Sequence, residues 1–265
     1  MILPVTQSTL VFFSACTLVL YALAVRHRRY QRCKAIESRF SHRASSSMAV
    51  EEAHQIIREL RELEFPYTMH NAMKLSLLKL FVATGQLNEK NMSKRAADTE
   101  VLLNEVHDRR PGSEMHLRGI ARMNYLHSRF RKAGKILDED MLHTLGSAVV
   151  DICRGIDRNE WRSLTHVERC AIGVFHKALG DAMEIPFTFL SNSESGWTDG
   201  AHFVQDLCDW TLAYELTAAK PNESTKVIGQ RLMDLGTWNL PCFLRLVARR
   251  VISSKLDRHM RVSME

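Results

Sequence analysis

One histidine of this chain, His127, falls on the apolar side of a predicted helix. Residues at i, i+3, i+7 and i+10 share one side of a helix, and here they are Ile120, Met123, His127 and Phe130. An imidazole on such a surface needs a partner for each ring nitrogen. A backbone carbonyl or water is one answer. A haem iron is another, because a histidine in an apolar wall holds haem where no thiolate does. His127 is therefore either a candidate iron ligand or a satisfied core histidine.

Three polar residues of the preceding predicted helix also share one face. Arg95 and Thr99 are four residues apart, and Asp98 is three residues from Arg95. A solvated ion pair is the ordinary interpretation of such spacing. The spacing alone leaves open whether the three residues have a further role.

Other histidines are weaker candidates. His176, in VFHKALGD, is a second choice as ligand or pocket residue, and His143, in MLHTLGS, either lines a pocket or is satisfied in the core. His166, Glu168 and His202 imitate a non-haem iron site of two histidines and one carboxylate, although a helix cap explains the Glu168 segment better. The chain contains no HExxH, P-loop, dinucleotide-binding glycine motif or nucleophile elbow.

The elements that position these residues are predicted to be helices. Of 265 residues, 45% are apolar, while only 12 are glycine and 6 are proline, a composition typical of a globular helical chain. No strand-like alternation extends beyond a few residues. Ser113, Asp138 and the Thr165–Glu168 capping box mark helix starts. The expected fold class is all-α, a single helical bundle with helices over 48–64, 69–84, 91–107, 139–156, 198–220, 224–236 and 242–256, one following Ser113, and one from Thr165 to before Pro186.

The N-terminal segment has the composition of a membrane anchor. Residues 1–25 contain no charged side chain, and a helix of that length reaches about 37 Å, enough to cross a hydrocarbon core of about 30 Å. A cleaved signal peptide carries its basic residues before the apolar run, whereas here they follow it. Residues 1–25 are therefore predicted to be a single transmembrane helix.

A basic collar follows the predicted anchor. Residues 26–43 hold seven Lys and Arg side chains against Glu37, which accounts for the whole formal net charge of +6. Positive charge favours the cytoplasmic side, so we expect a lumenal N-terminus and a cytosolic bulk, with anionic lipids as partners and no nucleic acid. Residues 26–47 are the expected collar and linker, and 48–265 the expected helical domain.

Cysteine spacing agrees with a cytosolic location. The six cysteines form no CxxC pair and match neither a zinc site nor a disulfide framework, so reduced thiols are expected. Asn91 and Asn222 lie in glycosylation sequons, which a cytosolic domain would leave unmodified.

Several segments resemble a known family. The run ARMNYLHSRFRKAG around His127 resembles the helix of the proximal haem histidine in the latex-clearing protein (rubber oxygenase) superfamily, and RAADT at Arg95–Thr99 resembles its distal helix. The closer resemblance is to fungal oxygenases of the MpaB type, which are bound to the endoplasmic reticulum. It is carried by LNEKNMSKRAADTEVLL, KAGKILDEDMLHTLGS, CAIGVFHKALGDAMEIPFT and LPCFLRLVARRVISSKLDRHMRVS, and covers nearly all of residues 50–262.

The resemblance implies a haem b cofactor with dioxygen as co-substrate. His127 would be the axial ligand, Arg95 would donate to bound dioxygen, and Asp98 and Thr99 would hold or move a proton beside it. Asp98 stands where rubber-cleaving relatives carry lysine, so no distal lysine ligand is expected. Further cofactor contacts are expected from Arg122, His143 and His176.

One segment departs from the family pattern. MpaB-type proteins carry a Thr-Tyr-Gly-Ile-Pro turn after the first apolar helix, whereas here Leu75–Lys79 runs directly into Leu80–Leu87. The resemblance places this shortened segment beside the pocket, where it bears on activity and substrate fit.

The expected function is that of an oxygenase anchored in the endoplasmic reticulum membrane. With haem b it would oxidise or cleave a double bond of a prenyl or terpenoid chain in secondary metabolism, so its other expected partner is a hydrophobic prenylated small molecule. The alternative is a non-catalytic, membrane-anchored helical scaffold or lipid-binding protein, which the shortened segment favours.

Overall fold

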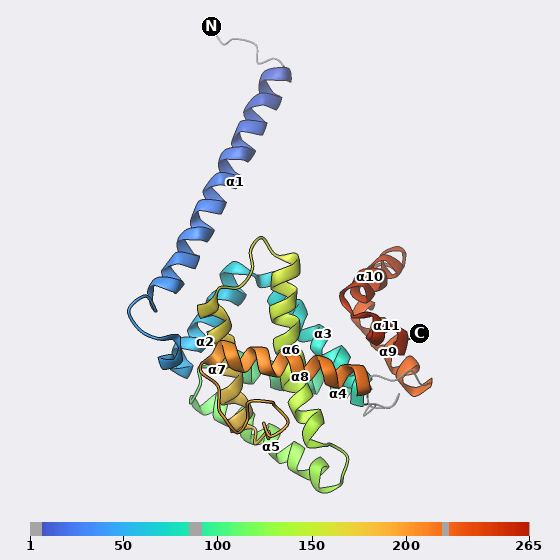
Figure 1. Cartoon of the computed structure of the whole chain (residues 1–265). Helices are drawn as coiled ribbons and strands as arrows, with labels where there is room; N and C mark the ends of the chain where they lie inside the picture. Colours follow the sequence, from blue (N-terminus) through green and yellow to red (C-terminus); the bar gives the residue numbers. More distant parts are fainter. Residues whose placement is uncertain (1–6, 85–91, 219–222, 265) are drawn as a thin grey trace. The chain divides into compact units, whose positions relative to one another are not determined.

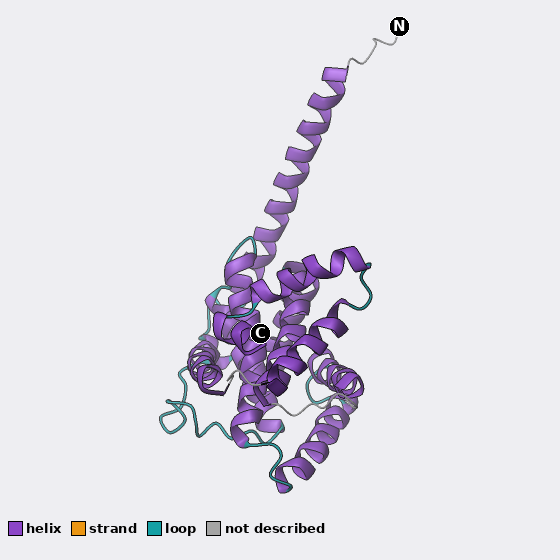
Figure 2. Cartoon of the chain, turned by 90° about the vertical axis from the view of Figure 1, so that its right-hand side faces the viewer, coloured by secondary structure: helices purple, strands orange, loops and turns teal. Residues whose placement is uncertain are grey.

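Helices make up all the regular structure that the computed structural model describes, which is residues 7–84, 92–218 and 223–264 (Figure 2). No strand occurs in these residues, so the predicted all-α class is confirmed. The chain divides into two compact units, Met1–Ala44 and Ser45–Glu265. The asparagines of both sequons, Asn91 and Asn222, lie outside the described residues.

The first unit contains one long helix, α1 (Gln7–Ser38). Its segment Thr9–Ser38 contains an 18-residue window with a mean hydropathy of 1.8, and in the described part of the chain this helix alone is long and apolar enough to cross a membrane. The helix continues past the predicted end of the anchor at Val25 and through much of the basic collar. Arg and Lys are good helix formers, so the charge that ends the apolar run does not end the helix.

The second unit is built around α6 (Asp138–Asn159), which is buried on most of its sides. Helix α6 packs against α3 (Pro66–Thr84) and α8 (Gly200–Ala218), and α8 packs in turn on α7 (His166–Ala182), as Figure 1 shows. Helix α2 (Val50–Glu59) covers α7 and continues as a π-helix over Leu60–Glu64. The remaining helices are α4 (Met92–Asp108), α5 (Glu114–Lys132), α9 (Glu223–Thr237), α10 (Cys242–Lys255) and α11 (Arg258–Met264).

The caps explain where three of these helices begin. Ser113 Oγ accepts the amide of His116 at the start of α5, and Thr165 and Glu168 form the predicted capping box of α7. The predicted cap Asp138 is wrong by one residue. Leu137 holds the N-cap position of α6, and its amide donates to the Asp140 carboxylate at 2.9 Å.

A pair of glycines allows α7 and α8 to cross closely. A Cβ atom added to Gly173 would overlap the carbonyl group of Gly200, and one added to Gly200 would overlap the carbonyl of Cys170. Because neither glycine has a side chain, the start of α8 packs directly against the middle of α7, backbone against backbone.

Candidate functional site

A cavity of about 350 Å³ lies among helices α3 to α7 of the second unit. This volume is at the lower end of the range for small-molecule sites, about 300–1,000 Å³. Its wall is mostly apolar: α3, α5 and α6 each contribute leucine and methionine side chains, while α4 and α7 contribute leucine without methionine. Its polar lining residues are Ser76, Asp98, Thr99, His107, His127, Asp140, Thr144 and His176.

His127 lines this cavity from α5, on the same wall as Met123 and Phe130. Its Nδ1 atom is buried and accepts or donates no hydrogen bond in the described part of the structure. Burial and the nearby charge of Arg131 lower the pKa of His127, so the ring is neutral near pH 7. The structure therefore offers a neutral imidazole in an apolar wall.

Two further histidines, His107 at the end of α4 and His176 in α7, present similar groups. Their Nδ1 atoms each lie 2.7 Å from a carbonyl oxygen four residues earlier, that of Leu103 and that of Ile172. Because a carbonyl only accepts, each Nδ1 must carry the proton, and the lone pair is left on Nε2. Both Nε2 atoms are buried without a hydrogen-bond partner in the described residues.

Burial keeps these two rings neutral. It lowers the pKa of His107 to about 4 and that of His176 to about 3. The ring centroids lie 5.6 Å apart, and the neighbouring His107 further lowers the pKa of His176. The sequence analysis missed His107, although a signal was present: Thr99, Leu103 and His107 recur every four residues and so share one side of α4.

The predicted distal group on α4 is described only in part. Thr99 is half-buried and lines the cavity. Asp98 also lines it, but its side chain is 61% exposed and pairs with Lys94 at 2.7 Å, so it stands at the rim. Arg95 belongs to α4, and its side chain lies outside the described part of the structure.

The structure does not bring two of the expected cofactor contacts to the cavity. Arg122 is exposed on α5, where its guanidinium group lies 5.7 Å from the centroid of the Tyr125 ring. His143 is fully buried, but it faces α8, where its Nε2 lies 3.3 Å from Glu215 Oε1. Both residues are on helices that line the cavity, on sides that turn away from it.

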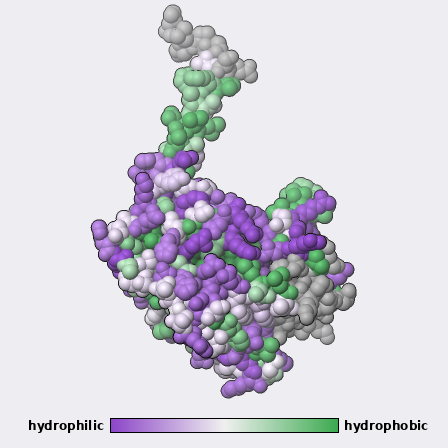
Figure 3. All heavy atoms as spheres, viewed as in Figure 1, coloured by the Kyte–Doolittle hydropathy of each residue, from purple (hydrophilic) through white to green (hydrophobic). Residues whose placement is uncertain are grey.

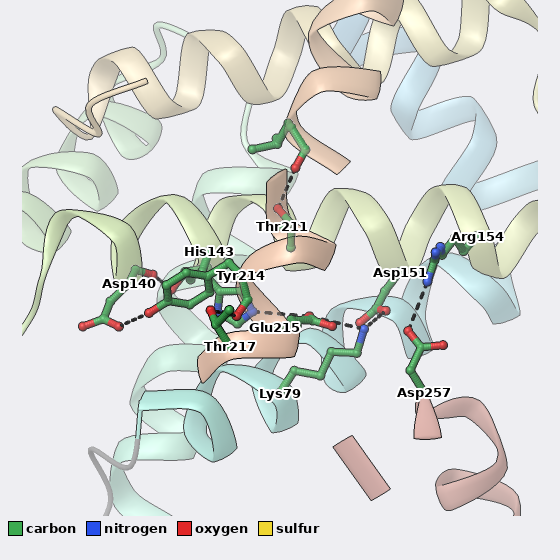
Figure 4. A network of polar contacts seen from close by, with 12 residues as sticks. Lys79, Asp140, His143, Asp151, Arg154, Thr211, Tyr214, Glu215, Thr217 and Asp257 are labelled. Carbon is green, nitrogen blue, oxygen red and sulfur yellow. Dashed lines mark hydrogen bonds and ion pairs between the residues drawn. The ribbon is translucent and has the colours of Figure 1, made fainter. Parts of the chain in front are cut away.

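His143 belongs instead to a buried group of ionisable side chains, in which it contacts Glu215 (Figure 4). The ammonium group of Lys79, on α3, lies 2.6 Å from Asp151 Oδ1 on α6 and 3.7 Å from Glu215 Oε1 on α8. Burial disfavours the charge on Lys79, but Asp151 and Glu215 outweigh it and raise the pKa of the lysine. Burial raises the pKa of Asp151 to about 6, in spite of Lys79.

Tyr214 connects this ionic cluster (Lys79, His143, Asp151 and Glu215) to the cavity wall. The Tyr214 ring lies 5.1 Å from that of His143, and its hydroxyl donates to Asp140 Oδ1 at 3.0 Å. Asp140 lines the cavity. The pKa of Tyr214 is raised by burial and by Asp140, which keeps the phenol protonated and able to donate.

The alternative iron site around His166 is not assembled. His166 Nε2 lies 2.9 Å from Asp199 Oδ2, and His202 Nδ1 accepts the amide of Thr198. Glu168 is bound by both terminal nitrogens of Arg162 at 2.7 Å in addition to its capping role. Across the described ranges, no three His, Cys, Asp or Glu side chains are grouped so that they could hold a metal ion.

Comparison with known proteins gives three similar relatives. The "ER-bound oxygenase mpaB" of Penicillium roqueforti (strain FM164) is 33% identical over 95% of this chain and 89% of its own length. In Penicillium brevicompactum, the "ER-bound oxygenase mpaB'" is 32% identical over 93% of this chain, and the "ER-bound oxygenase mpaB" 33% identical over 79%. The alignments span 62% and 57% of these two longer proteins. No protein-family profile and no solved structure matches the chain.

Proposed function

This chain belongs to the family of ER-bound oxygenases named MpaB, and on that premise we propose that it is a haem b-dependent oxygenase acting on a prenylated small molecule. Membership of the family supports an oxidoreductase that uses dioxygen. The cofactor, the substrate class and the orientation in the membrane are the further parts of the proposal.

The observation that carries the proposal is the set of neutral imidazoles in one apolar cavity. Each of His107, His127 and His176 has a buried ring nitrogen without a hydrogen-bond partner in the described residues, and such atoms are costly unless a ligand takes them up. These residues fit haem, since an axial histidine in an apolar wall is what haem b requires. We assign His127 as the axial residue, with His176 as the second candidate. A macrocycle together with a substrate would need the cavity to widen beyond 350 Å³.

When bound, haem b would supply the dioxygen chemistry, while the protein supplies binding and orientation. The cavity side of α4 would provide the groups that hold or move a proton, with the Thr99 hydroxyl on the wall and the Asp98 carboxylate at the rim. The apolar lining would exclude water and bind the hydrocarbon chain, at about 0.8 kcal/mol for each methylene group buried. Lining residues suited to this role are Leu102, Leu126, Phe130, Met141 and Leu145.

The proposed location is the endoplasmic reticulum membrane, with α1 as a single anchor and the second unit in the cytosol. The names of the relatives and the length and hydropathy of Thr9–Ser38 support an anchor. The basic residues that follow it, Arg26 to Arg43, support the cytosolic side for the rest of the chain.

One observation favours the non-catalytic alternative. Helix α3 runs without a break from Pro66 to Thr84, through the position where the family resemblance predicts a turn. Within this helix, Lys79 is buried in an ion pair with Asp151. A lipid-binding protein without haem would keep the same apolar cavity.

Absorption spectroscopy separates the two functions. The full chain, purified in detergent and supplied with haem, should give a Soret band that His127→Ala abolishes and that the exposed-site control His166→Ala preserves. A chain that folds but gives no Soret band after haem addition would support the lipid-binding alternative. Bound iron without a Soret band would contradict both.

A further inference from the structure

Helix α10 turns an apolar face toward solvent. Phe243, Val247 and Val251 recur every four residues on this face, and the Phe243 side chain is 74% exposed. Leu244 and Leu246 flank them and are exposed as well. Helices of soluble domains normally turn such a stripe inward. The space-filling view shows a hydrophobic group of atoms at the position of α10 in Figure 1 (Figure 3).

The opposite side of α10 is held in place, so the outward face is a fixed feature of the fold. Ile252 packs against a small core formed by Leu78, Met233, Leu256 and Met260. Arg249 forms an ion pair with Asp234 of α9, and Arg245 donates to the carbonyls of Trp238 and Leu240 at 2.9 Å. These contacts join α10 to α9, α11 and α3, and they leave the apolar residues free to meet a partner.

The basic residues of α10 differ in their position. The helix contains no acidic residue and four basic ones: Arg245 and Arg249 make the contacts on the held side, whereas Arg250 and Lys255 are exposed. Arg250 is exposed beside the apolar stripe, and its long stem can keep the guanidinium group at a polar boundary. Trp238, 69% exposed, precedes the helix, and tryptophan is enriched where apolar and aqueous phases meet. An apolar face with basic residues and an aromatic anchor is typical of a helix that lies in a membrane interface.

We propose that the exposed face of α10, together with Trp238, lies in the headgroup region of an anionic phospholipid bilayer and forms a membrane contact separate from α1. This goes beyond the oxygenase activity and rests only on the proposed anchoring by α1. With α1 inserted, the second contact becomes intramolecular, so a weak interfacial affinity is sufficient to keep α10 at the surface. The domain would then be held where a prenylated substrate is dissolved.

The charge favours a bilayer over a second copy of the chain. In a two-fold dimer built on this face, the exposed Arg250 and Lys255 of one α10 would lie near those of the other, and the helix carries no acidic residue to compensate them. Anionic headgroups supply that compensation at the edges of the apolar stripe.

The test uses the full chain in vesicles of phosphatidylcholine and phosphatidylserine. Cys242 is exposed at the start of α10 and can carry a fluorescent label once Cys16 and Cys208 are replaced by serine. The control label is placed by Glu194→Cys together with Cys242→Ser. Glu194 is exposed in the loop between α7 and α8, well before α10 in the sequence. Nitroxide lipids labelled near the headgroup should quench the Cys242 label at least about twofold more than the control label.

Phe243→Ser with Val247→Ser should reduce that quenching to the control level, while Val247→Leu preserves it. Sedimentation of all variants with the vesicles should be unchanged, because α1 remains; loss of sedimentation would instead reveal a failure of the anchor. Equal quenching at the two labels would overturn the proposal. Self-quenching of the Cys242 label that rises with protein density, without quenching by the lipid, would overturn it in favour of a second copy. None of these results depends on haem binding.

Discussion

The ammonium group of Lys79 lies 2.6 Å from the carboxylate of Asp151, and only 2% and 7% of the two side chains is exposed. The pair joins α3 to α6, and Glu215 extends it to α8. One ammonium group thus faces two carboxylates in a medium that disfavours any unpaired charge. The cluster therefore holds together α3 and α6, two of the helices that line the cavity, and joins them to α8.

Removal of the lysine should therefore destabilise the bundle strongly. Lys79→Met leaves Asp151 and Glu215 buried without their cation, and breaking a buried pair in this way costs about 3–5 kcal/mol. Urea unfolding followed by circular dichroism would measure the loss. The matched control is Lys94→Met, which removes an exposed ion pair with Asp98 and should change the midpoint little. A small effect of Lys79→Met would mean that the buried carboxylates are already protonated.

Acid should destabilise the protein through the buried histidines. Their pKa values, about 4 for His107 and about 3 for His176, lie below the ordinary value of 6.5, so the unfolded chain binds more protons as the pH falls below about 6.5. For each of the two histidines, the free energy of unfolding should therefore fall by about 2 kcal/mol between pH 6 and 4.5. Asp151 acts in the opposite direction, since its folded pKa of about 6 exceeds the ordinary 3.8 and its protonation favours the folded state in the same window.

Two histidines outweigh one aspartate, so the net effect should be a loss of stability on acidification. His176→Leu should flatten the dependence measured by denaturant unfolding across this pH range, and Asp151→Asn should make it steeper. A stability that is constant from pH 6.5 to 4.5 would show that the imidazoles are not held neutral.

The identity of the axial residue can be tested among the three cavity histidines. His127→Gly should weaken haem binding by more than about 100-fold, beyond the effect usual for residues that only support a metal ligand. Added imidazole should restore the Soret band of this variant, because the cavity left by the side chain can admit the free base. His107→Ala and His176→Ala should keep the band with smaller changes in affinity. If His107→Ala or His176→Ala lost the Soret band while His127→Gly kept it, the axial ligand would be assigned to α4 or α7 instead of α5.

The sequence predicted local structure well because its signals are local. Ser113 and the Thr165–Glu168 pair mark helix starts through contacts within one turn, and the His127 stripe is a property of a single helix. The Lys79 cluster could not be predicted in this way. Its partners on α6 and α8 are brought together by packing, and Lys79 and Asp151 are 72 residues apart along the chain.

His143 illustrates a second limit. Helix α6 is buried on nearly all sides, so an apolar neighbourhood in the sequence does not tell which side a residue faces. Met141, Thr144 and Ala148 face the cavity, while His143 faces Glu215 on α8. Helix α10 shows the reverse case, in which an apolar stripe that would ordinarily predict a core-facing side is turned outward.

The orientation in the membrane can be read from the two sequons. If the second unit is cytosolic, Asn91 and Asn222 should both remain unglycosylated when the chain is expressed in a eukaryotic cell, because the oligosaccharide is added in the lumen. A glycosidase-induced mobility shift on a gel is the measurement. As a control, a sequon added before residue 7 should be modified if the N-terminus is lumenal. Modification at Asn91 or Asn222 would reverse the proposed topology.

The crossing of α7 and α8 should tolerate no side chain at Gly173. An added Cβ would overlap the Gly200 carbonyl, which is backbone and cannot rotate away, so Gly173→Ala must push the two helices apart. We expect a loss of more than about 3 kcal/mol, at the upper end of overpacking effects, and weaker haem binding because His176 lies on the same helix. Gly236→Ala is the matched control. It also lies in a helix, but a Cβ there meets no atom within 4 Å, so it should be neutral or stabilising by up to about 1 kcal/mol. Thermal unfolding of the two variants side by side would decide, and equal midpoints would show that the close crossing does not exist in solution.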